Sequence, residues 1–542
     1  MARVHGPDDR SRLQRWVLGP GAVALAVSVV VAVLTVGRTA GRGLYLVRDF
    51  VSVPDPVAPL TLVPDSWAAL RAWPLDGVMW ALTRVMPAGV VQLAMVTACF
   101  VLAGTGVGVL VGRLGRLPAA LGALAATWNP YVTERLLMGQ PPTLLAYAAV
   151  PWIILAARSP VAGWRRFLLV GLAALPAAVT PWGGVVAGVT AFGATLTRAQ
   201  MRRSDLAGTG ITALLLCLPW LVPAVILSMS GAARSLADAD GVAAFALADD
   251  TGHGVWLSAV TGGGIWAEAA RPDSRLSLPT FVSAVLLLSI ALAAALTLPT
   301  RHSGKLAATA GLLLPASLLS AASTSGLGLF GRLQAVPGMA LLRDQHRLLG
   351  FAVIAQALLL AALVGQLRRW GSVAPLLAGL TITSLVVASV PDQARSVAAI
   401  YRPVTFPSSW GQVVQAVEEE QAGMTAPAVV LSLPWQPLRR PTWGSRTPFL
   451  DPTPRGVPAV VLTSSELNVR RGEAVLVVDD EPYDVGHEWG RGELTPSTLR
   501  AHAVTHVLEW LETPGDLARS HEGWHEVLRT SSWVLWRVSS TR

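Results

Sequence analysis

The stretch that decides the fold is WNPYVTERLLMGQPPTLLAYAAVPW, from Trp128 to Trp152. Glu134, Arg135 and Gln140 interrupt an apolar run here, and apolar sequence of membrane length resumes directly after them. A lone Glu or Arg costs about 2.5 to 3.5 kcal/mol at the middle of a bilayer, so such residues pair, reach the surface or line a wet cavity. We therefore expect this segment to form the rim of an outward-facing active site.

The composition places the chain among polytopic membrane proteins. Of its 542 residues, 52% are hydrophobic and 14% are charged, whereas about 25% are charged in a soluble domain. The net charge of +9 does not indicate a nucleic-acid partner, because the arginines lie in short clusters between apolar runs, as in cytoplasmic loops. Lys305 is the only lysine, a bias typical of GC-rich bacterial genomes. Cys99 and Cys217 both fall in apolar runs, which disfavours a disulfide or a metal site.

Eleven apolar runs are predicted to cross the membrane as helices. The first, Trp16 to Val36, is longer than the apolar core of a signal peptide, so we expect an uncleaved helix with a cytoplasmic N-terminus. The other ten are residues 90–111, 118–128, 143–157, 167–182, 183–197, 206–229, 279–298, 306–325, 348–366 and 373–390. All six predicted cytoplasmic segments carry Arg or Lys, and the odd number of spans places the C-terminal part outside. The sequence thus predicts a multi-pass protein of a bacterial plasma membrane.

Three longer segments are predicted on the outer side. Two are the outer loops 37–89 and 230–278, and the first of these carries two short amphipathic helical patterns with tryptophans, typical of the membrane interface. The third, 392–542, is more polar and holds an amphipathic helix at 410–421. It also has short runs rich in β-formers at residues 428–433, 459–463, 474–478, 505–510 and 532–538. We therefore predict a transmembrane domain over 1–391 and an extracytoplasmic α/β domain over 392–542.

Three clusters on the predicted outer side could carry chemistry. They are Arg48-Asp49, Glu134-Arg135, and the segment RDQHR with Arg343, Asp344, His346 and Arg347. Outer arginines run against the charge bias that orients the protein, so local function or ion pairing must retain them. A carboxylate can take the proton from an incoming hydroxyl, while a guanidinium grips a leaving phosphate with two hydrogen bonds. This combination suits group transfer from a lipid phosphate.

Each cluster also has a purely structural interpretation. Asp49 could be a turn residue or half of a loop ion pair, and Glu134 with Arg135 could simply end a short helix that starts after Asn129-Pro130. Arg343 and Arg347 could extend toward the interface. The loop acids are interpreted as solvated charges: Asp238, Asp240, Asp249 and Asp250.

The sequence does not favour a metal centre or a nucleotide site. The helical spacing of His502 with His506 breaks at a predicted strand, and His521 with His525 lacks a zinc-protease pattern. An acidic turn at 479–481 could hold Ca²⁺, although a plain turn is the preferred interpretation. No metal ligand is assigned, and a divalent metal is left open as a cofactor. No Walker A loop, G-x-S-x-G or dinucleotide fingerprint is present.

The order of these parts resembles the GT-C superfamily of membrane glycosyltransferases. The resemblance lies in an acid in the first outer loop, interfacial helices behind it, a second acidic outer loop, an Arg-bearing segment before a late helix, and a C-terminal outer domain. Short motifs are similar to those of cell-envelope arabinofuranosyl- and mannosyltransferases of GC-rich Gram-positive bacteria. These motifs are NPYVTERLLMGQ at 129–140, LLAYAAVPW at 144–152, LPWQPLRRPTW at 433–443 and DPTPR at 451–455.

The resemblance implies transfer of a sugar from a polyprenyl-phosphate donor to an envelope glycan or lipid acceptor on the outer face, as part of cell wall biogenesis, with membrane lipids as further partners. Asp49 matches the first-loop acid and is expected to be the general base, and Glu134 matches the second acid, which would orient the acceptor. The expected substrate-binding residues are Arg48, Arg135, Gln140, Arg343, His346 and Arg347. Asp49 follows Arg48 rather than a second acid, which departs from the paired-acid form of the motif.

Two other classes of function fit the same residues. In a transporter or flippase of an envelope lipid, the outer charges would line a translocation path. In a non-catalytic envelope-assembly protein, the C-terminal domain would hold a partner. The sequence gives the DPTPR segment no role in any of the three.

Overall fold

The structure is a computed structural model that describes residues 19–59, 67–198, 200–229, 239–298, 303–324, 343–445, 447–471, 473–478 and 486–539. The N-terminal arginines, Asp238 and the acidic turn at 479–481 lie outside these residues. The chain divides into two compact units. The described residues of the first unit fall within 1–38, 95–218 and 237–398, and those of the second within 39–94, 219–236 and 399–542. The predicted domain boundary at residue 392 and the sidedness of either part stay predictions.

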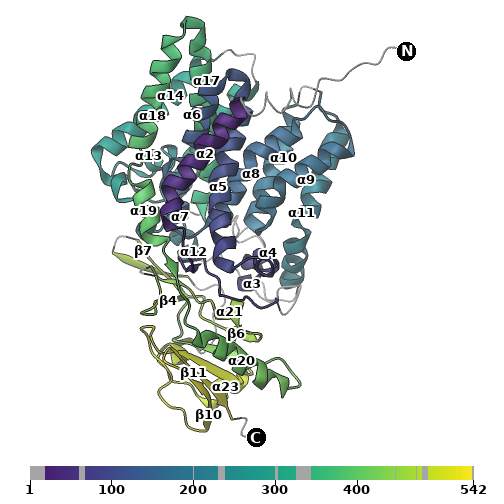
Figure 1. The fold of residues 1–542 in the computed structure, drawn as a ribbon, viewed down its shortest axis with the longest axis vertical. Coiled ribbons are helices and arrows are strands. Elements are labelled where there is room, and N and C mark those ends of the chain that lie inside the picture. The colour runs from purple at the N-terminus through teal and green to yellow at the C-terminus, as the bar shows by residue number, and fades with distance from the viewer. Residues whose placement is uncertain are drawn as a thin grey trace. The chain divides into compact units, whose positions relative to one another are not determined.

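Long apolar helices dominate the transmembrane part (Figure 1). They are α2 (Pro20–Val36), α5 (Ala88–Leu110), α6 (Arg116–Thr127), α8 (Pro141–Ala157), α9 (Trp164–Ala178), α10 (Pro181–Leu196), α11 (Arg203–Met229), α14 (Leu278–Thr297), α15 (Ser303–Thr324), α17 (Gly350–Leu367) and α18 (Val373–Ala388). Each of the eleven runs predicted as spans coincides with one of these helices. Within the described ranges, six helical segments are long and apolar enough to cross a membrane. The helices are thus those of a multi-pass membrane protein, and crossing by all eleven stays a prediction.

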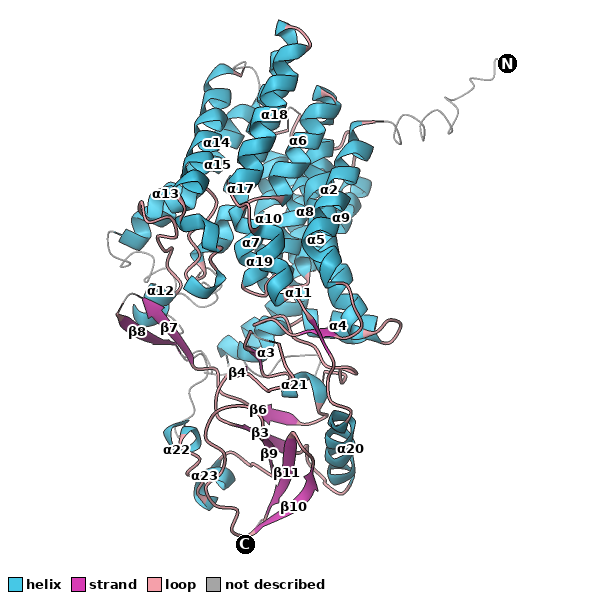
Figure 2. Ribbon diagram, turned by 60° about the vertical axis from the view of Figure 1, so that its left-hand side comes forward, coloured by secondary structure: helices cyan, strands magenta, loops and turns pink. Residues whose placement is uncertain are grey.

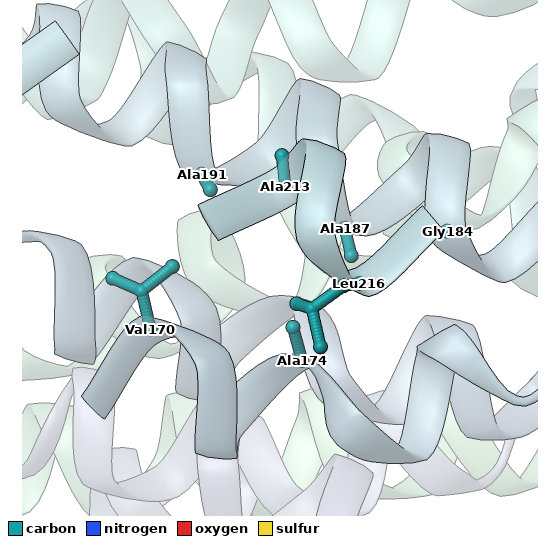
Figure 3. Close-up of a pocket in the computed structure, with 7 residues that line it drawn as sticks. All are labelled: Val170, Ala174, Gly184, Ala187, Ala191, Ala213 and Leu216. Carbon is teal, nitrogen blue, oxygen red and sulfur yellow. The ribbon is translucent and has the colours of Figure 1, made fainter. Parts of the chain in front are cut away.

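The helices of the first unit pack through small residues, as helices in lipid do. Ala24 of α2 is enclosed with Ala119 and Ala123 of α6, and a Cβ added to Gly108 would lie 2.2 Å from the Cβ of Ala24. A hollow between α9, α10 and α11 is lined by the same kind of residue (Figure 3). Its lining is Val170, Ala174, Gly184, Ala187, Ala191, Ala213 and Leu216. Because no polar side chain lines this hollow, it is part of the helix packing rather than a candidate site.

The short helix α7 (Pro130–Leu137) connects α6 to α8. It begins as its sequence predicts, with Pro130 at the first helical position and the Oδ1 of Asn129 accepting a hydrogen bond of 2.9 Å from the backbone N–H of Val132. The predicted short helix after Asn129-Pro130 is therefore confirmed. All residues of α7 are buried, which corrects the expectation of an exposed rim: Glu134 and Arg135 lie in the interior of the first unit.

Shorter helices of the first unit, and the loops between them, lie near α7. They are α12 (Ala239–Ala244), α13 (Val255–Val260), η3 (Glu268–Ala270), η4 (Asp273–Leu276), η6 (Gln345–Leu349) and α19 (Gln393–Ile400). The loop after α13 contains a run of three glycines, 262–264, of which Gly262 and Gly264 have φ of +84° and +94°. Side chains are disfavoured at such φ, so this loop depends on glycine.

The second unit contains a mixed five-stranded sheet with the order β10-β11-β9-β3-β6 (Figure 2). Its strands are β3 (Val429–Leu433), β6 (Val460–Leu462), β9 (His506–Trp510), β10 (Trp524–Arg529) and β11 (Trp533–Val538). β3 pairs in parallel with both β6 and β9, whereas β11 pairs antiparallel with β9 and β10. The strands and helices predicted between 410 and 538 are therefore present, as expected of an α/β fold.

Helices and two-stranded sheets complete the second unit. They are α3 (Trp67–Ala72), α4 (Leu75–Thr83), α20 (Ser409–Ala422), α21 (Thr453–Gly456), α22 (Gly486–Gly490), α23 (Pro496–Ala501), and the strand pairs β1 (Leu44–Tyr45) with β2 (Pro403–Val404), β4 (Leu438–Arg439) with β5 (Phe449–Leu450), and β7 (Leu467–Arg471) with β8 (Ala474–Val478). Trp410 of α20 packs with Trp510 and Trp533 of the sheet in a buried aromatic core. The two short helices predicted after residue 66 are present, and their place at a membrane interface stays a prediction.

Candidate functional site

The interior of the first unit holds a set of ionisable side chains that we call the buried charge cluster. Its members are Glu134, Arg135, Asp250, Arg275, Asp344 and His346, each at most 5% exposed. Removing an ion from water costs several kcal/mol unless the ion is paired and hydrogen-bonded. The partners of each member therefore show what the cluster is built to do.

Arg135 on α7 binds two neighbouring side chains through Nη1 and Nη2, while its buried Nε has no hydrogen-bond partner among the described residues. Its Nη1 and Nη2 donate hydrogen bonds of 2.7 and 2.8 Å to the two carboxylate oxygens of Asp344, and Nη1 donates another of 2.6 Å to Oε1 of Gln140. Arg347 approaches the same Asp344 carboxylate, with 3.1 Å between Nε and Oδ2, and keeps 24% of its side chain exposed. Arg347 thus lies partly exposed at the edge of the cluster, whereas Arg135 is fully enclosed.

Asp250 and Arg275 form the second buried pair of the cluster. Nε and Nη2 of Arg275 donate hydrogen bonds of 2.8 and 2.9 Å to the Asp250 carboxylate, and Nη2 also donates to Oγ1 of Thr261 at 3.0 Å. Asp250 is 2% exposed, so its interpretation as a solvated loop charge is wrong. The reason is that the guanidinium of Arg275 donates a hydrogen bond to each oxygen of Asp250, which offsets the cost of removing this carboxylate from water.

Glu134 is the least satisfied acid of the cluster. Its Oε2 accepts a hydrogen bond of 3.2 Å from the backbone N–H of Ile265. Nε2 of His346 lies 3.0 Å from the same oxygen, but the ring is not aligned for a hydrogen bond. The other oxygen, Oε1, is buried and accepts no hydrogen bond from the residues that the structure describes. A buried carboxyl group left in this state requires an explanation beyond packing.

The backbone of Gly263 is the point on which Glu134, Asp250 and Arg275 converge. A Cβ added to this glycine would lie 2.3 Å from Oδ2 of Asp250, 2.5 Å from Nη2 of Arg275 and 2.8 Å from Oε1 of Glu134. No side chain fits there, so the glycine run at 262–264 is what allows two acids and a guanidinium to crowd together.

The surroundings move the pKa values of the three acids apart. Burial, followed by the negative charge of Asp250, raises the pKa of the Glu134 carboxyl well above its ordinary value. Burial alone would also raise the pKa of Asp250, but the guanidinium of Arg275 outweighs it and holds that pKa below its ordinary value. Asp344 behaves like Asp250, because Arg135 and Arg347 outweigh its burial. Acids with pKa values pushed in opposite directions are typical of sites with acid–base chemistry.

Asp49 lies in the second unit, exposed on a tight turn. The turn is closed by backbone hydrogen bonds in both directions between Val47 and Phe50, at 3.0 and 2.8 Å. Arg48 has φ of +48°, a left-handed conformation that costs a non-glycine residue roughly 1–2 kcal/mol. Such strain persists only where the surroundings enforce it and is frequent at functional sites. Here two further backbone hydrogen bonds hold Arg48, one from its N–H to the carbonyl of Pro448 and one to its carbonyl from the N–H of Leu450.

The structure thus brings five of the predicted site residues together and leaves three elsewhere. Glu134, Arg135, Gln140, His346 and Arg347 belong to or contact the buried charge cluster. The remaining three are Arg343, whose guanidinium lies 4.5 Å from the ring centroid of Phe245, and Arg48 and Asp49, which belong to the second unit. A joint action of Asp49 and Glu134 stays a prediction.

Sequence reasoning missed Asp250, Arg275 and Gly263. The signals were present in the adjacent acids Asp249 and Asp250 and in the glycine run. Asp249 caps the loop by accepting hydrogen bonds from the N–H groups of residues 251, 252 and 254, so the neighbouring acid is left for Arg275. The acidic pair at 249–250 and the glycine run at 262–264 thus belong to an ordered loop with a buried acid.

DPTPR, which the sequence left without a role, forms a structural turn in the second unit. Oδ1 of Asp451 accepts hydrogen bonds from the N–H and the hydroxyl of Thr453, at 2.9 and 2.6 Å. Nε of Arg455 donates a 3.0 Å hydrogen bond to Asp76 at the start of α4. The motif therefore ties the loop that precedes α5 to the C-terminal part of the same unit. Among the described residues, no group of three His, Cys, Asp or Glu side chains could hold a metal ion.

One solved structure shares the fold of nearly the whole chain. The structure is similar over 97% of the chain to that of arabinofuranosyltransferase AftD from mycobacteria, with a TM-score of 0.58 at 15% identity, and the chain spans 40% of the length of that protein. The same comparison found the archaeal oligosaccharyltransferase AglB from Archaeoglobus fulgidus, with 10% identity, a TM-score of 0.41, and coverage of 90% of this chain and 69% of the other.

No protein-family model matches the sequence, and no curated protein matches it either. The first of the two structures thus shares the fold of this chain, and membership of the GT-C superfamily belongs to the proposal. Activity, substrates and partners are matters for proposal, because a fold shared at such low identity does not fix them.

Proposed function

We propose that this protein is an integral membrane glycosyltransferase that moves a sugar from a polyprenyl-phosphate donor to a glycan or lipid acceptor of the cell envelope, on the extracytoplasmic face. The observation that carries the proposal is the likeness of nearly the whole chain to a structure of the arabinofuranosyltransferase AftD. Eleven membrane spans, an outer C-terminal domain and arabinofuranose as the sugar belong to the same proposal.

The proposed chemistry needs a base and a grip on the leaving phosphate. Asp49 removes the proton from the acceptor hydroxyl as that oxygen attacks the anomeric carbon, and the bond from this carbon to the lipid phosphate breaks. Arg347, with Arg343 beside it in sequence, binds the phosphate as negative charge collects on it. Glu134 orients the acceptor. Arg135 acts one step back, by holding the Asp344 carboxylate that Arg347 also contacts.

Two features of the residues support these roles. Asp49 stands exposed on a strained, hydrogen-bonded turn, where a general base can meet an acceptor without moving the backbone. The side chain of Arg347 is partly exposed and its Nε lies 3.1 Å from Oδ2 of Asp344, so the guanidinium stands at the edge of the buried charge cluster.

The direct test incubates the purified protein in lipid nanodiscs with a panel of polyprenyl-phosphate sugars and measures release of the lipid phosphate. Wild type is expected to release it from at least one donor. Asp49→Asn should lower turnover by about 10²- to 10⁴-fold and still bind that donor. Asp55→Asn, a change of the same kind at an exposed acid of the same loop, is the matched control and should keep its turnover.

The other functional classes would give different results. A flippase would move labelled lipid across vesicles without any glycan product. An assembly protein would do neither, and release by Asp49→Asn at the wild-type rate would remove Asp49 from the mechanism.

A further inference from the structure

The buried charge cluster contains one acid more than its enclosed guanidiniums can neutralise. Asp344 accepts hydrogen bonds from Nη1 and Nη2 of Arg135, and Asp250 accepts hydrogen bonds from Nε and Nη2 of Arg275. Glu134 is as deeply buried as either, yet no guanidinium donates a hydrogen bond to it in the part of the chain that the structure describes. An ionised Glu134 would therefore be an unpaired buried charge, which proteins avoid by taking up a proton.

The geometry shows where that proton belongs. Oε1 of Glu134 and Oδ2 of Asp250 both point at the space beside the α-carbon of Gly263, at 2.8 and 2.3 Å from the position a Cβ would take. The two carboxyl groups also make a side-chain hydrogen bond to each other, and because carboxylate oxygens only accept hydrogen bonds, one of the two groups must carry the proton. Because Arg275 binds both oxygens of Asp250, Asp250 is the one that stays charged.

We propose that Glu134 and Asp250 share a single proton carried by Glu134, and that Arg275 is the positioning residue that keeps Asp250 the charged member of the pair. Four charged or titratable groups face Glu134, and the guanidinium of Arg275 among them favours the ionised form but is outweighed by burial and by Asp250. They are Arg135 on α7, Asp250 in the loop after α12, Arg275 on η4 and His346 on η6. Burial and the charge of Asp250 both favour the neutral form of Glu134.

This assignment deepens the proposed function and rests on it only for the consequence in turnover. With its proton held in the hydrogen bond to Asp250, a neutral Glu134 accepts a hydrogen bond from the acceptor hydroxyl through its other oxygen and does not compete with Asp49 for the proton of that hydroxyl. The two acids then have separate tasks, because Asp49 accepts the proton and Glu134 accepts only a hydrogen bond.

The test is infrared difference spectroscopy of the full-length protein in nanodiscs, which follows the C=O stretch of protonated carboxyl groups and needs no substrate. At neutral pH, subtraction of the Glu134→Gln spectrum from the wild-type spectrum should show one protonated carboxyl band. Asp250→Asn removes the neighbouring negative charge and frees Arg275 for Glu134, so the midpoint at which the band disappears should fall by about one pH unit or more. Arg275→Gln should add a second protonated carboxyl band, because Asp250 loses its cation.

The matched control is Asp205→Asn, which removes a buried acid held by Arg166 in the same unit, away from Glu134. It should leave the Glu134 band and its midpoint unchanged. The proposal is overturned if wild type and Glu134→Gln give the same carboxyl spectrum at neutral pH, if Asp250→Asn leaves the midpoint of the band unchanged, or if Arg275→Gln adds no second band. Each variant decides the point alone, so failure of one to fold leaves the other. A wild-type protein that transfers no sugar but shows the band would end the proposed function and leave this assignment standing.

Discussion

The buried acids Glu134 and Asp451 differ in how completely the protein satisfies them. Asp451, in the second unit, accepts four hydrogen bonds, two from Thr453 and one each from Ser432 and Arg439. Glu134, in the first unit, accepts one from the backbone and has an oxygen with no donor among the described residues. A fully satisfied buried network fixes a fold, whereas a partly satisfied one is costly and is kept where it serves chemistry. The two acids thus separate a structural site from a candidate functional one.

The largest expected effect is a loss of stability when Asp451, the fully satisfied acid, is replaced. Asp451→Ala leaves Arg439 as a fully buried cation without its carboxylate, a change that costs about 3 to 5 kcal/mol. Hydrogen–deuterium exchange should show the amides of β3 and β9 exchanging about 10²- to 10³-fold faster, since about 1.4 kcal/mol corresponds to a factor of ten. Asp516→Ala, an exposed acid of the same unit, is the control. Equal exchange in both variants would remove the structural role of Asp451.

The next effect tests the crowding at Gly263. Gly263→Ala places a Cβ within 2.8 Å of polar atoms of three side chains, and overpacking of this kind costs about 1 to 3 kcal/mol. The variant should unfold at lower temperature than wild type and lose turnover. Gly210→Ala in α11, where a Cβ would meet nothing within 4 Å, is the matched control and should do neither. Identical melting of the two variants would show that the three side chains do not meet at this glycine.

The smallest effect is a dependence of stability on pH. The folded pKa of Glu134 is raised, so its contribution to stability is fully present below the ordinary value of about 4.3 and is lost as pH rises through the folded pKa, at up to about 1.4 kcal/mol per pH unit. Between pH 5 and 7, wild type should therefore lose thermal stability more steeply than Glu134→Gln. Asp250 and Asp344 have lowered pKa values and act only as pH falls below about 3.9, outside this window.

The control for the pH series is Glu268→Gln, which changes an acid with a 70% exposed side chain in the same unit. Its slope should match wild type. A Glu134→Gln slope that also matched wild type would mean that Glu134 is ionised throughout the window.

The sequence predicted the helices and strands well, because their causes are local. A helix in lipid needs about 20 apolar residues, and a strand of a half-buried sheet is rich in β-branched residues, so both patterns can be read from neighbouring letters. Ion pairs between residues that are far apart in the sequence leave no such pattern. Asp250 is buried only because Arg275 follows 25 residues later, and Asp344 is 209 residues from Arg135. The candidate site was therefore recognised in part, by residues that break an apolar run, while their partners were found only in the structure.

The central claim is that Glu134, the partly satisfied acid, serves turnover, whereas Asp451, the satisfied acid, serves stability. The most direct test measures lipid-phosphate release per folded molecule in Glu134→Ala and in Asp451→Ala. The account predicts a loss of about 100-fold or more for Glu134→Ala, in the range of a removed catalytic hydrogen bond, and a rate within about twofold of wild type for folded Asp451→Ala. Turnover that survives in Glu134→Ala while folded Asp451→Ala is inactive would contradict it.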